Sequence, residues 1–304
     1  MNQSQIDTLN QKFGIPNVVE VISGSGGLPK IHVTYPSATA DIYLHGAQLT
    51  SWQPVNADEV LFLSEHSSWQ DGRAIRGGIP VCFPWFRSKV DAPSAPAHGF
   101  VRTKEWRVES VKIDGESVVV ICSTENDEST HRWWPQAFRL VHILSIGKSL
   151  RLELIVTNTG PTSFRFEEAL HTYFRVSQVQ KVSIRGLDQI AYLDNIHGNC
   201  KKTQSGDLIL TAKTDNAYIN VNSAAELVDP TCRRTIRTEK ENSATTVVWN
   251  PWQEGAASLN DLGDDEWRQF ACVEASNVLA SAISLAPGQE HRMQAIISVV
   301  SKTA

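Results

Sequence analysis

Two neighbouring runs of alternating side chains constrain this chain more than any other feature of its sequence. The runs are Phe138–Ile146 and Leu150–Asn158, and they lie on either side of the dipeptide Gly147-Lys148. A period of two places successive side chains on opposite faces, which is typical of half-buried β-strands. Two such strands joined by so short a turn form an antiparallel hairpin. We therefore expect antiparallel sheet at the centre of the fold.

The rest of the chain repeats this pattern. Glu105–Lys112 and Val118–Cys122 flank Asp114-Gly115, a dipeptide that accepts the positive φ angles of a tight hairpin turn. Further β-like runs are Ala40–Leu44, Val182–Arg185, Leu208–Ala212, Tyr218–Val221, Ala225–Val228, Thr231–Thr238, Thr245–Trp249, Phe270–Ala275 and Met293–Val300. Strands without intervening helices build stacked or closed antiparallel sheets, so an all-β fold is expected and a parallel α/β fold is excluded.

Evidence for helices is thin. The best stretches are Ser4–Phe13, where Ser4 and Asp7 are spaced as a capping pair, and the acidic segment Leu262–Gln269. Neither has a long amphipathic stripe. With 304 residues and no composition break, linker or internal repeat, the chain is expected to form one domain over residues 1–304, with its motifs between about 40 and 300.

Charge and composition exclude several classes of partner. The 28 Lys and Arg residues against 33 Asp and Glu residues give a net charge of −5, and no basic block occurs. We therefore expect neither nucleic acid nor a membrane as partner. The first fourteen residues do not resemble a secretion signal, and the five cysteines lack CxxC pairs. A cytoplasmic, monomeric protein with reduced thiols is expected.

Two irregular segments rich in Gly and Pro carry arginines. Arg76 stands at the start of IRGGIPVCFPWF, and Arg102 ends DAPSAPAHGFVR. Rigid, irregular loops let backbone approach a ligand closely, and two guanidinium groups suit the oxygens of a phosphate. The alternative for each is a surface arginine beside a turn, because sequence spacing does not show that the two converge.

Two further segments place polar side chains in apolar surroundings. His171 lies in FRFEEALHTYFRV, three residues after Glu168, and Glu274 lies in the strand-like run FACVEASN after WNPW. A histidine can exchange a proton near neutral pH, and a carboxylate in an apolar strand is costly unless it is paired or functional. A core histidine bonded to backbone remains the alternative for His171.

Other kinds of catalytic site find little support. The nine histidines are scattered, without HExxH or another ligand spacing, so a metal centre is not expected. No GxSxG motif occurs, and Gly24–Gly27 is not followed by Lys-Ser or Lys-Thr as a P-loop would be. Glu167 and Glu168 would point to opposite faces of a strand, which is unsuited to paired-carboxylate chemistry.

Together, the motifs IRGGIPVCFPWF, PAHGFVRTKEW, EEALHTYF, TDNAY, VVWNPW and DDEWRQFACVEASN resemble the glucose-6-phosphate 1-epimerase (hexose-6-phosphate mutarotase) branch of the aldose 1-epimerase family. The resemblance runs from about Ile42 to Val299, with the motifs in family order. It implies a galactose-mutarotase-like β-supersandwich of antiparallel sheets. It also implies an isomerase that interconverts the α and β anomers of a hexose 6-phosphate without a metal or organic cofactor.

The resemblance also assigns residues. It implies that His171 is the general acid and Glu274 the general base. Substrate binding falls to a second group, which comprises Asp215 and His98 for the sugar and Arg76 and Arg102 for the phosphate. Ala97 stands where some members carry Gln, a difference that bears on fine substrate preference.

This chemistry makes two demands on pKa values. Burial should raise the pKa of Glu274, and a carboxylate or backbone partner should keep His171 charged. A non-catalytic carbohydrate-binding β-sandwich is the main alternative, but binding alone needs no proton-transfer pair. A glycosidase is the second alternative, and it would need two carboxylates.

Overall fold

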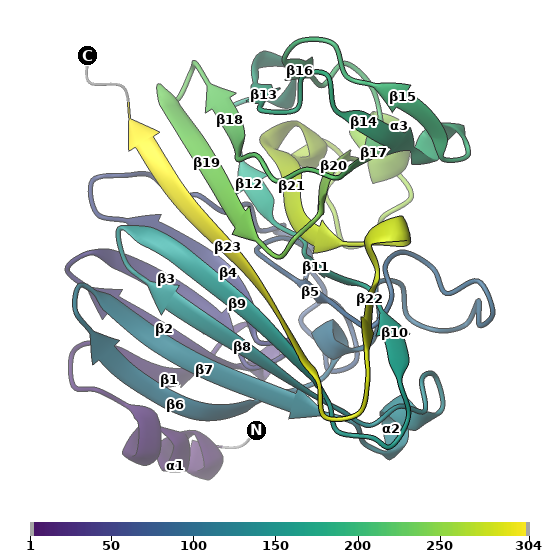
Figure 1. Ribbon diagram of the computed structural model, residues 1–304. Coiled ribbons are helices and arrows are strands. Elements are labelled where there is room, and N and C mark those ends of the chain that lie inside the picture. Colours follow the sequence, from purple (N-terminus) through teal and green to yellow (C-terminus); the bar gives the residue numbers. More distant parts are fainter. Residues whose placement is uncertain (1–2, 302–304) are drawn as a thin grey trace.

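The structure is a computed structural model, and it describes residues 3–301 (Figure 1). The strands of its described part are β1 Val19–Ser23, β2 Pro29–Tyr35, β3 Ala38–Tyr43, β4 Gln48–Pro54, β5 Val81–Cys82, β6 Arg107–Asp114, β7 Ser117–Glu125, β8 Phe138–Ile146, β9 Ser149–Asn158, β10 Phe164–Phe166, β11 Glu168–Leu170, β12 Tyr173–Arg175, β13 Ser183–Arg185, β14 Ala191–Asp194, β15 Cys200–Thr203, β16 Leu208–Ile209, β17 Thr214–Ile219, β18 Ala225–Asp229, β19 Arg234–Glu241, β20 Thr245–Asn250, β21 Phe270–Asn277, β22 Ile283–Leu285 and β23 Glu290–Ser301. Its α-helices are α1 Gln3–Phe13, α2 Glu128–His131 and α3 Trp252–Ala256.

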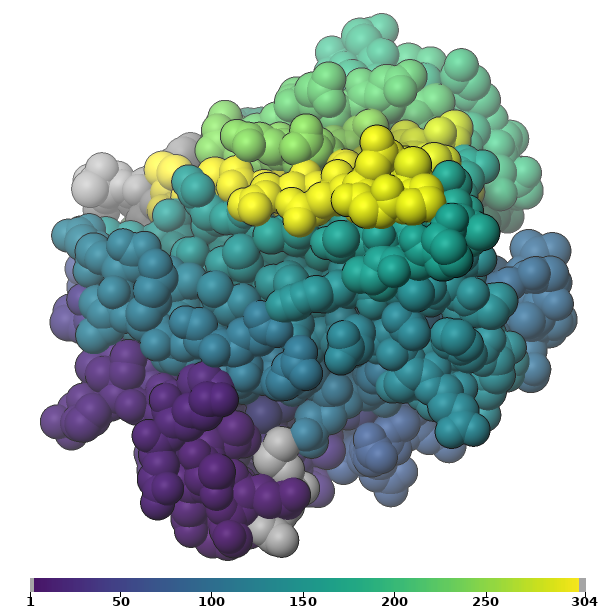
Figure 2. Space-filling model, turned by 60° about the horizontal axis from the view of Figure 1, so that its bottom comes forward, coloured from purple at the N-terminus to yellow at the C-terminus, as the bar shows by residue number. Residues whose placement is uncertain are grey.

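Most strands belong to three sheets. The largest has nine strands in the order β16-β13-β18-β19-β23-β9-β8-β7-β6, and a four-stranded sheet has the order β1-β2-β3-β4. In Figure 1 the four-stranded sheet lies behind the β6–β9 half of the larger one, with β23 crossing the middle. Figure 2 shows the C-terminal strand as a yellow band between the green and teal surfaces, as its pairing with β19 and β9 requires.

The third sheet carries the residues of most interest. Its strand order is β15-β14-β17-β20-β21-β11-β5, with β12 also paired to β21, and its ladders are antiparallel. It occupies the upper right of Figure 1. All eight residues of β21 are buried, so both faces of this strand are covered. A polar side chain on β21 therefore has to find its partner inside the protein.

The expected all-β architecture is confirmed. Both hairpins form as predicted, β8 with β9 and β6 with β7, and the buried residues of β8 alternate strictly along the strand. The predicted helix at Ser4–Phe13 appears as α1. The second predicted helix, Leu262–Gln269, is reduced to one 3₁₀ turn at Glu266–Gln269. The segment is acidic and lacks the apolar stripe by which a longer helix would pack against the core.

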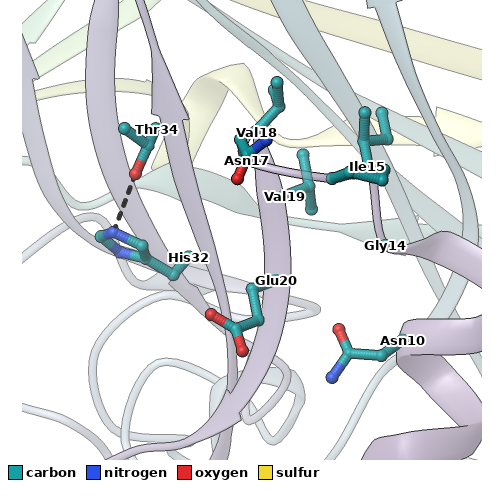
Figure 3. Close-up of a pocket in the computed structure, with 10 residues that line it drawn as sticks. Asn10, Gly14, Ile15, Asn17, Val18, Val19, Glu20, His32 and Thr34 are labelled. Atoms are coloured by element: carbon teal, nitrogen blue, oxygen red, sulfur yellow. Dashed lines mark hydrogen bonds between the residues drawn. The ribbon is translucent and has the colours of Figure 1, made fainter.

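Helix α1 packs beside β1 and borders a groove of about 580 Å³. The Asn10 side chain clamps the backbone of Val21 with two hydrogen bonds of 2.6 Å. Figure 3 shows the groove, with the Thr34–His32 hydrogen bond on its wall. None of the predicted site residues lines this groove. Within residues 3–301, no helix has the length and apolar character needed to cross a bilayer.

Candidate active site

Three adjacent strands of the third sheet bring the candidate residues onto one face. Asp215 on β17 is opposite Trp249 on β20, and Trp249 is opposite Cys272 on β21. Glu274 lies two residues beyond Cys272 and therefore points to the same side. Residues more than fifty positions apart in sequence meet here because antiparallel pairing aligns their strands.

His171 reaches the same place from the neighbouring strand. It follows β11, which pairs with β21, and its backbone N–H donates to the carbonyl of Pro80 at 2.9 Å. Its Nε2 atom lies 3.4 Å from Oε1 of Glu274, and both side chains are buried. The Tyr173 ring stacks on the imidazole at 4.8 Å between centroids, and Trp249 meets it edge-on. The imidazole orientation is thus set by packing.

A cavity of about 50 Å³ lies against this pair. Its lining is formed by Phe86, Arg87, His98, His171, Asp215, Val247, Trp249 and Glu274. Four of the six predicted site residues therefore meet at one cavity, namely His171, Glu274, Asp215 and His98. The two predicted arginines do not line it, although both lie close enough to act on the charge of His171.

The Gly-Gly pair of the first motif explains the position of Arg76. Gly77 and Gly78 adopt φ angles of 113° and 62°, and a Cβ at either would collide with backbone of residues 62–63 or 49–50. The loop can therefore lie flat against two other segments only with glycine. The Arg76 side chain, at the start of this loop, donates hydrogen bonds to both carboxylate oxygens of Asp261, at 3.1 Å each. It also donates to the Tyr173 hydroxyl at 2.9 Å.

Arg102 is in a different situation. It is only 9% exposed, yet its one hydrogen bond in the described structure runs from Nη2 to the carbonyl of Ala97, at 2.9 Å, and Nε has no partner. No acidic side chain within residues 3–301 forms an ion pair with it. Burial lowers the pKa of Arg102, and the nearby Arg76 lowers it further. A buried cation without an anion is costly, so this position would be stabilised by a bound anion.

His98 is held in one tautomer by its own loop. The backbone N–H of Arg87 donates to His98 Nδ1 at 3.3 Å, which leaves the proton of the neutral ring on Nε2. Burial lowers the pKa of His98 well below its ordinary value, and the charge of Arg102 adds to this effect. The ring is therefore a neutral hydrogen-bond donor at the cavity.

The two partners of the central pair shift in opposite directions. Burial raises the pKa of Glu274 well above its ordinary value, and the charge of Asp215 adds to the rise, as the sequence predicted. Burial lowers the pKa of His171 well below its ordinary value, helped by Arg102 and Arg76. The expectation that a partner keeps His171 charged is wrong, because burial and the charges of Arg102 and Arg76 disfavour the cation, and Nδ1 has no hydrogen-bond partner among the described residues. Both shifts favour neutral side chains over an ion pair.

Sequence reasoning missed two residues that hold Asp215. Arg87 donates from Nη2 to one carboxylate oxygen at 2.6 Å, and Asn195 donates to the other at 2.6 Å. Arg87 sits at φ 62°, a left-handed conformation that few non-glycine residues adopt. Neither residue belongs to a recognisable motif, so the pairing could be seen only once the chain had folded.

Glu168, which the sequence placed beside His171, belongs elsewhere. Its carboxylate lies 2.9 Å from Nε2 of His291 on β23 and accepts from Asn277 at 2.9 Å. Since Asn277 and Glu274 are three residues apart on one strand, they point to opposite faces. The sheet therefore separates Glu168 from the cavity.

Comparisons with known proteins agree with this geometry. The sequence model for "Aldose 1-epimerase" matches residues 29–298. The chain belongs to the aldose 1-epimerase family. It is 32% identical over 295 residues to a protein of Cenchrus ciliaris named "Putative glucose-6-phosphate 1-epimerase", covering 92% of this chain and 88% of that one. A protein of Escherichia coli K12 with the same name is 34% identical over 81% of this chain and 82% of its own.

Solved structures place the fold in the same family. The crystal structure named "a putative mutarotase" from Salmonella typhimurium superposes with a TM-score of 0.88 and 28% identity, covering 97% of this chain and all of that one. The galactose-mutarotase-like architecture expected from the motifs is therefore confirmed, and this aldose 1-epimerase family member is an isomerase.

Proposed function

We propose that the protein is a hexose-6-phosphate mutarotase that interconverts the α and β anomers of glucose 6-phosphate. The observation that carries the proposal is the buried His171–Glu274 pair, 3.4 Å apart beside a cavity that also holds Asp215 and His98. The names of the two relatives above support the choice of substrate, and the arginines beside the cavity support a phosphorylated sugar.

The pair contains the acid and the base that ring opening needs. As a carboxylate, Glu274 takes the proton of the C1 hydroxyl while protonated His171 gives one to the ring oxygen, so the C1–O5 bond breaks and an aldehyde forms. Rotation about C1–C2 and closure on the other face reverse both transfers. The neutral pair that both pKa shifts favour differs from this arrangement by one proton transfer from Glu274 to His171.

Asp215 and His98 are proposed to hold the sugar hydroxyls. A carboxylate accepts hydrogen bonds, and the Nε2–H of His98 donates one, so together they recognise a hydroxyl in both of its roles. The cavity of about 50 Å³ is small beside the roughly 300–1,000 Å³ usual for ligand sites. Arg87 forms its wall and also lines an outer groove of about 530 Å³, so we expect its bond to Asp215 to open when a sugar enters.

Arg102 and Arg76 are proposed to hold the 6-phosphate. Arg102 is a buried cation without an acidic partner, and a phosphate carries about −1.5 to −2 charges at neutral pH. The phosphate would replace the missing anion. Arg76 keeps its fork on Asp261 and would contribute chiefly through its charge.

Anomer-resolved NMR with freshly dissolved glucose 6-phosphate tests the proposal. Wild-type protein should speed the approach to the anomeric equilibrium, and Glu274→Gln should not. The matched control is Glu153→Gln, because Glu153 lies on β9 of the nine-stranded sheet, where it pairs with Arg292, and does not line the cavity. A disaccharide run in parallel separates the two rivals: sugar binding without acceleration would support a carbohydrate-binding module, and cleavage would support a glycosidase.

A further inference from the structure

A third side chain completes a donor set around the catalytic pair. A ring nitrogen of His171, Sγ of Cys272 and a carboxylate oxygen of Glu274 all lie within 4.8 Å of one another, and all three residues are buried. We propose that these three residues bind a borderline or soft divalent metal ion such as Zn²⁺, and that the ion is a reversible inhibitor of the enzyme.

The spacing matches the coordination of zinc. Zinc takes imidazole nitrogen at about 2.0–2.1 Å, carboxylate oxygen at about 2.0–2.2 Å and thiolate sulfur at about 2.3 Å, in tetrahedral geometry. Two such nitrogen and oxygen ligands lie roughly 3.3–3.5 Å apart. The observed separation of His171 Nε2 and Glu274 Oε1 is 3.4 Å. A metal ion could therefore be inserted with little movement of these two side chains.

The metal ion must displace the protons that burial favours on Glu274 and Cys272, because only the deprotonated groups are ligands. Neither carboxylate oxygen of Glu274 has a hydrogen-bond partner in the described structure, and the side chain is fully buried. Cys272 projects to the same face of β21 as Glu274, two residues away. The adjoining cavity leaves the fourth position open for water, as in sites with three protein ligands.

The surrounding charges set the strength and selectivity of the site. Arg87 and Arg102 act on Glu274 from nearby and oppose a further cation. We therefore expect weaker binding than at a structural zinc site, so a chelator should remove the ion. Mg²⁺ and Ca²⁺ prefer oxygen ligands and should not compete for a set containing sulfur and nitrogen.

Binding and inhibition can be tested separately. Titration with Co²⁺ reads the site without any activity, because a thiolate ligand gives a sulfur-to-metal charge-transfer absorption. The experiment uses the full chain with Cys200→Ser and Cys232→Ser, since these two cysteines are exposed and would bind metal elsewhere. This protein should show the thiolate band, and added Cys272→Ala should abolish it. The matched control is Cys122→Ala, a buried cysteine in the nine-stranded sheet, which should retain the band.

The inhibitory consequence, unlike the binding, rests on the proposed mutarotase function. Zn²⁺ on His171 and Glu274 should compete with glucose 6-phosphate, raising its apparent KM and leaving kcat unchanged. Loss of even an outer partner of a metal ligand costs about 10–100-fold in affinity, so Cys272→Ala should raise the inhibition constant at least tenfold.

The outcomes are distinguishable. Absence of a thiolate band, or a band that survives Cys272→Ala, would overturn the metal site whatever the enzyme does. Should Cys272→Ala fail to fold, Cys272→Ser replaces it, and glucose 6-phosphate must displace Co²⁺ from the wild type for the proposal to stand. A chain without mutarotase activity in metal-free buffer would instead refute the proposed function, and the cobalt spectrum would still decide the site.

Discussion

Two histidine–glutamate pairs lie on opposite faces of the third sheet, with the buried glutamate of one pair on β11 and that of the other on β21. On the inner face, Glu168 lies 2.9 Å from His291 and accepts a hydrogen bond of 2.9 Å from Asn277. On the other face, Glu274 lies 3.4 Å from His171, and neither of its oxygens has a hydrogen-bond partner in the part of the chain that the structure describes. The first pair joins two sheets, and the second faces a cavity.

The difference separates a structural pair from a reactive one. One oxygen of the Glu168 carboxylate accepts a hydrogen bond from Asn277 and lies at ion-pair distance from His291, which fixes its place between the third sheet and β23, and only its other oxygen has no partner in the described structure. Glu274 and His171 are buried equally well, but their surroundings shift their pKa values in opposite directions and leave donor atoms unused. Burial alone therefore does not mark a catalytic carboxylate; burial without compensating hydrogen bonds, beside a cavity, does.

The largest expected effect comes from removing the reactive pair. Glu274→Gln and His171→Asn should each lower the mutarotase rate by roughly 10²–10⁴-fold, since that is the usual contribution of a positioned acid or base. Anomer-resolved NMR measures the rate, and thermal unfolding should show that neither variant is less stable than wild type. Near wild-type rates in either variant would refute the assignment.

Breaking the structural pair should instead lower the stability and leave the mutarotase rate unchanged. His291→Ala leaves Glu168 buried without its partner, and removing one member of a buried pair costs about 3–5 kcal/mol. Chemical denaturation should show this loss in the free energy of unfolding. The kcat of the remaining folded protein should be unchanged, so a large fall in kcat with normal stability would mean that the two faces are not independent.

The arginines sharpen the contrast, because the charges of three of them, Arg76, Arg87 and Arg102, act on the reactive pair. Arg102→Ala should reduce kcat/KM for glucose 6-phosphate by roughly 10–100-fold, as expected for loss of a hydrogen bond between charged groups, and affect glucose far less. Arg76→Ala should act in the same direction. Arg107, whose side chain is 65% exposed, provides the control as Arg107→Ala. Equal losses with both sugars would indicate a structural role.

The smallest effect is in the pH dependence of stability. Because the pKa of Glu274 is raised in the folded state, the folded protein holds a proton that the unfolded chain releases above about pH 4.5. The free energy of unfolding should therefore fall as pH rises from there toward the raised pKa, by at most about 1.4 kcal/mol per pH unit from this group.

The comparison of wild type with Glu274→Gln isolates that contribution. His171 acts in the other sense, since its lowered pKa makes stability fall as pH drops below about 6.5. Denaturation curves between pH 5 and pH 9 should thus diverge toward high pH, with the variant gaining relative to wild type. Parallel curves would show that Glu274 is not perturbed.

The sequence predicted the parts of this protein that rest on local pattern. Alternation and turn residues were enough for the hairpins of β8–β9 and β6–β7, and the quoted motifs named His171 and Glu274, which the fold brings to within 3.4 Å of each other. Strands such as β15 escaped because all four of its residues are exposed, so no alternation is present. The Arg87–Asp215 contact joins residues 128 positions apart in the sequence. The lowered pKa of His171 likewise depends on burial and on distant arginines, so no local pattern predicts either feature.

Strand β21 carries Glu274 of the proposed catalytic pair on one side and the Asn277 side chain, bonded to Glu168, on the other. A slip of one residue against β20 would turn Glu274 inward and present Val273 or Ala275 to the sugar. The proposed activity and the packing between the two sheets therefore depend on the same strand register. A mutation that disturbs the register of β21 should reduce both the activity and the stability. Engineering of substrate choice is better directed to the loops at the rim than to the strand beneath them.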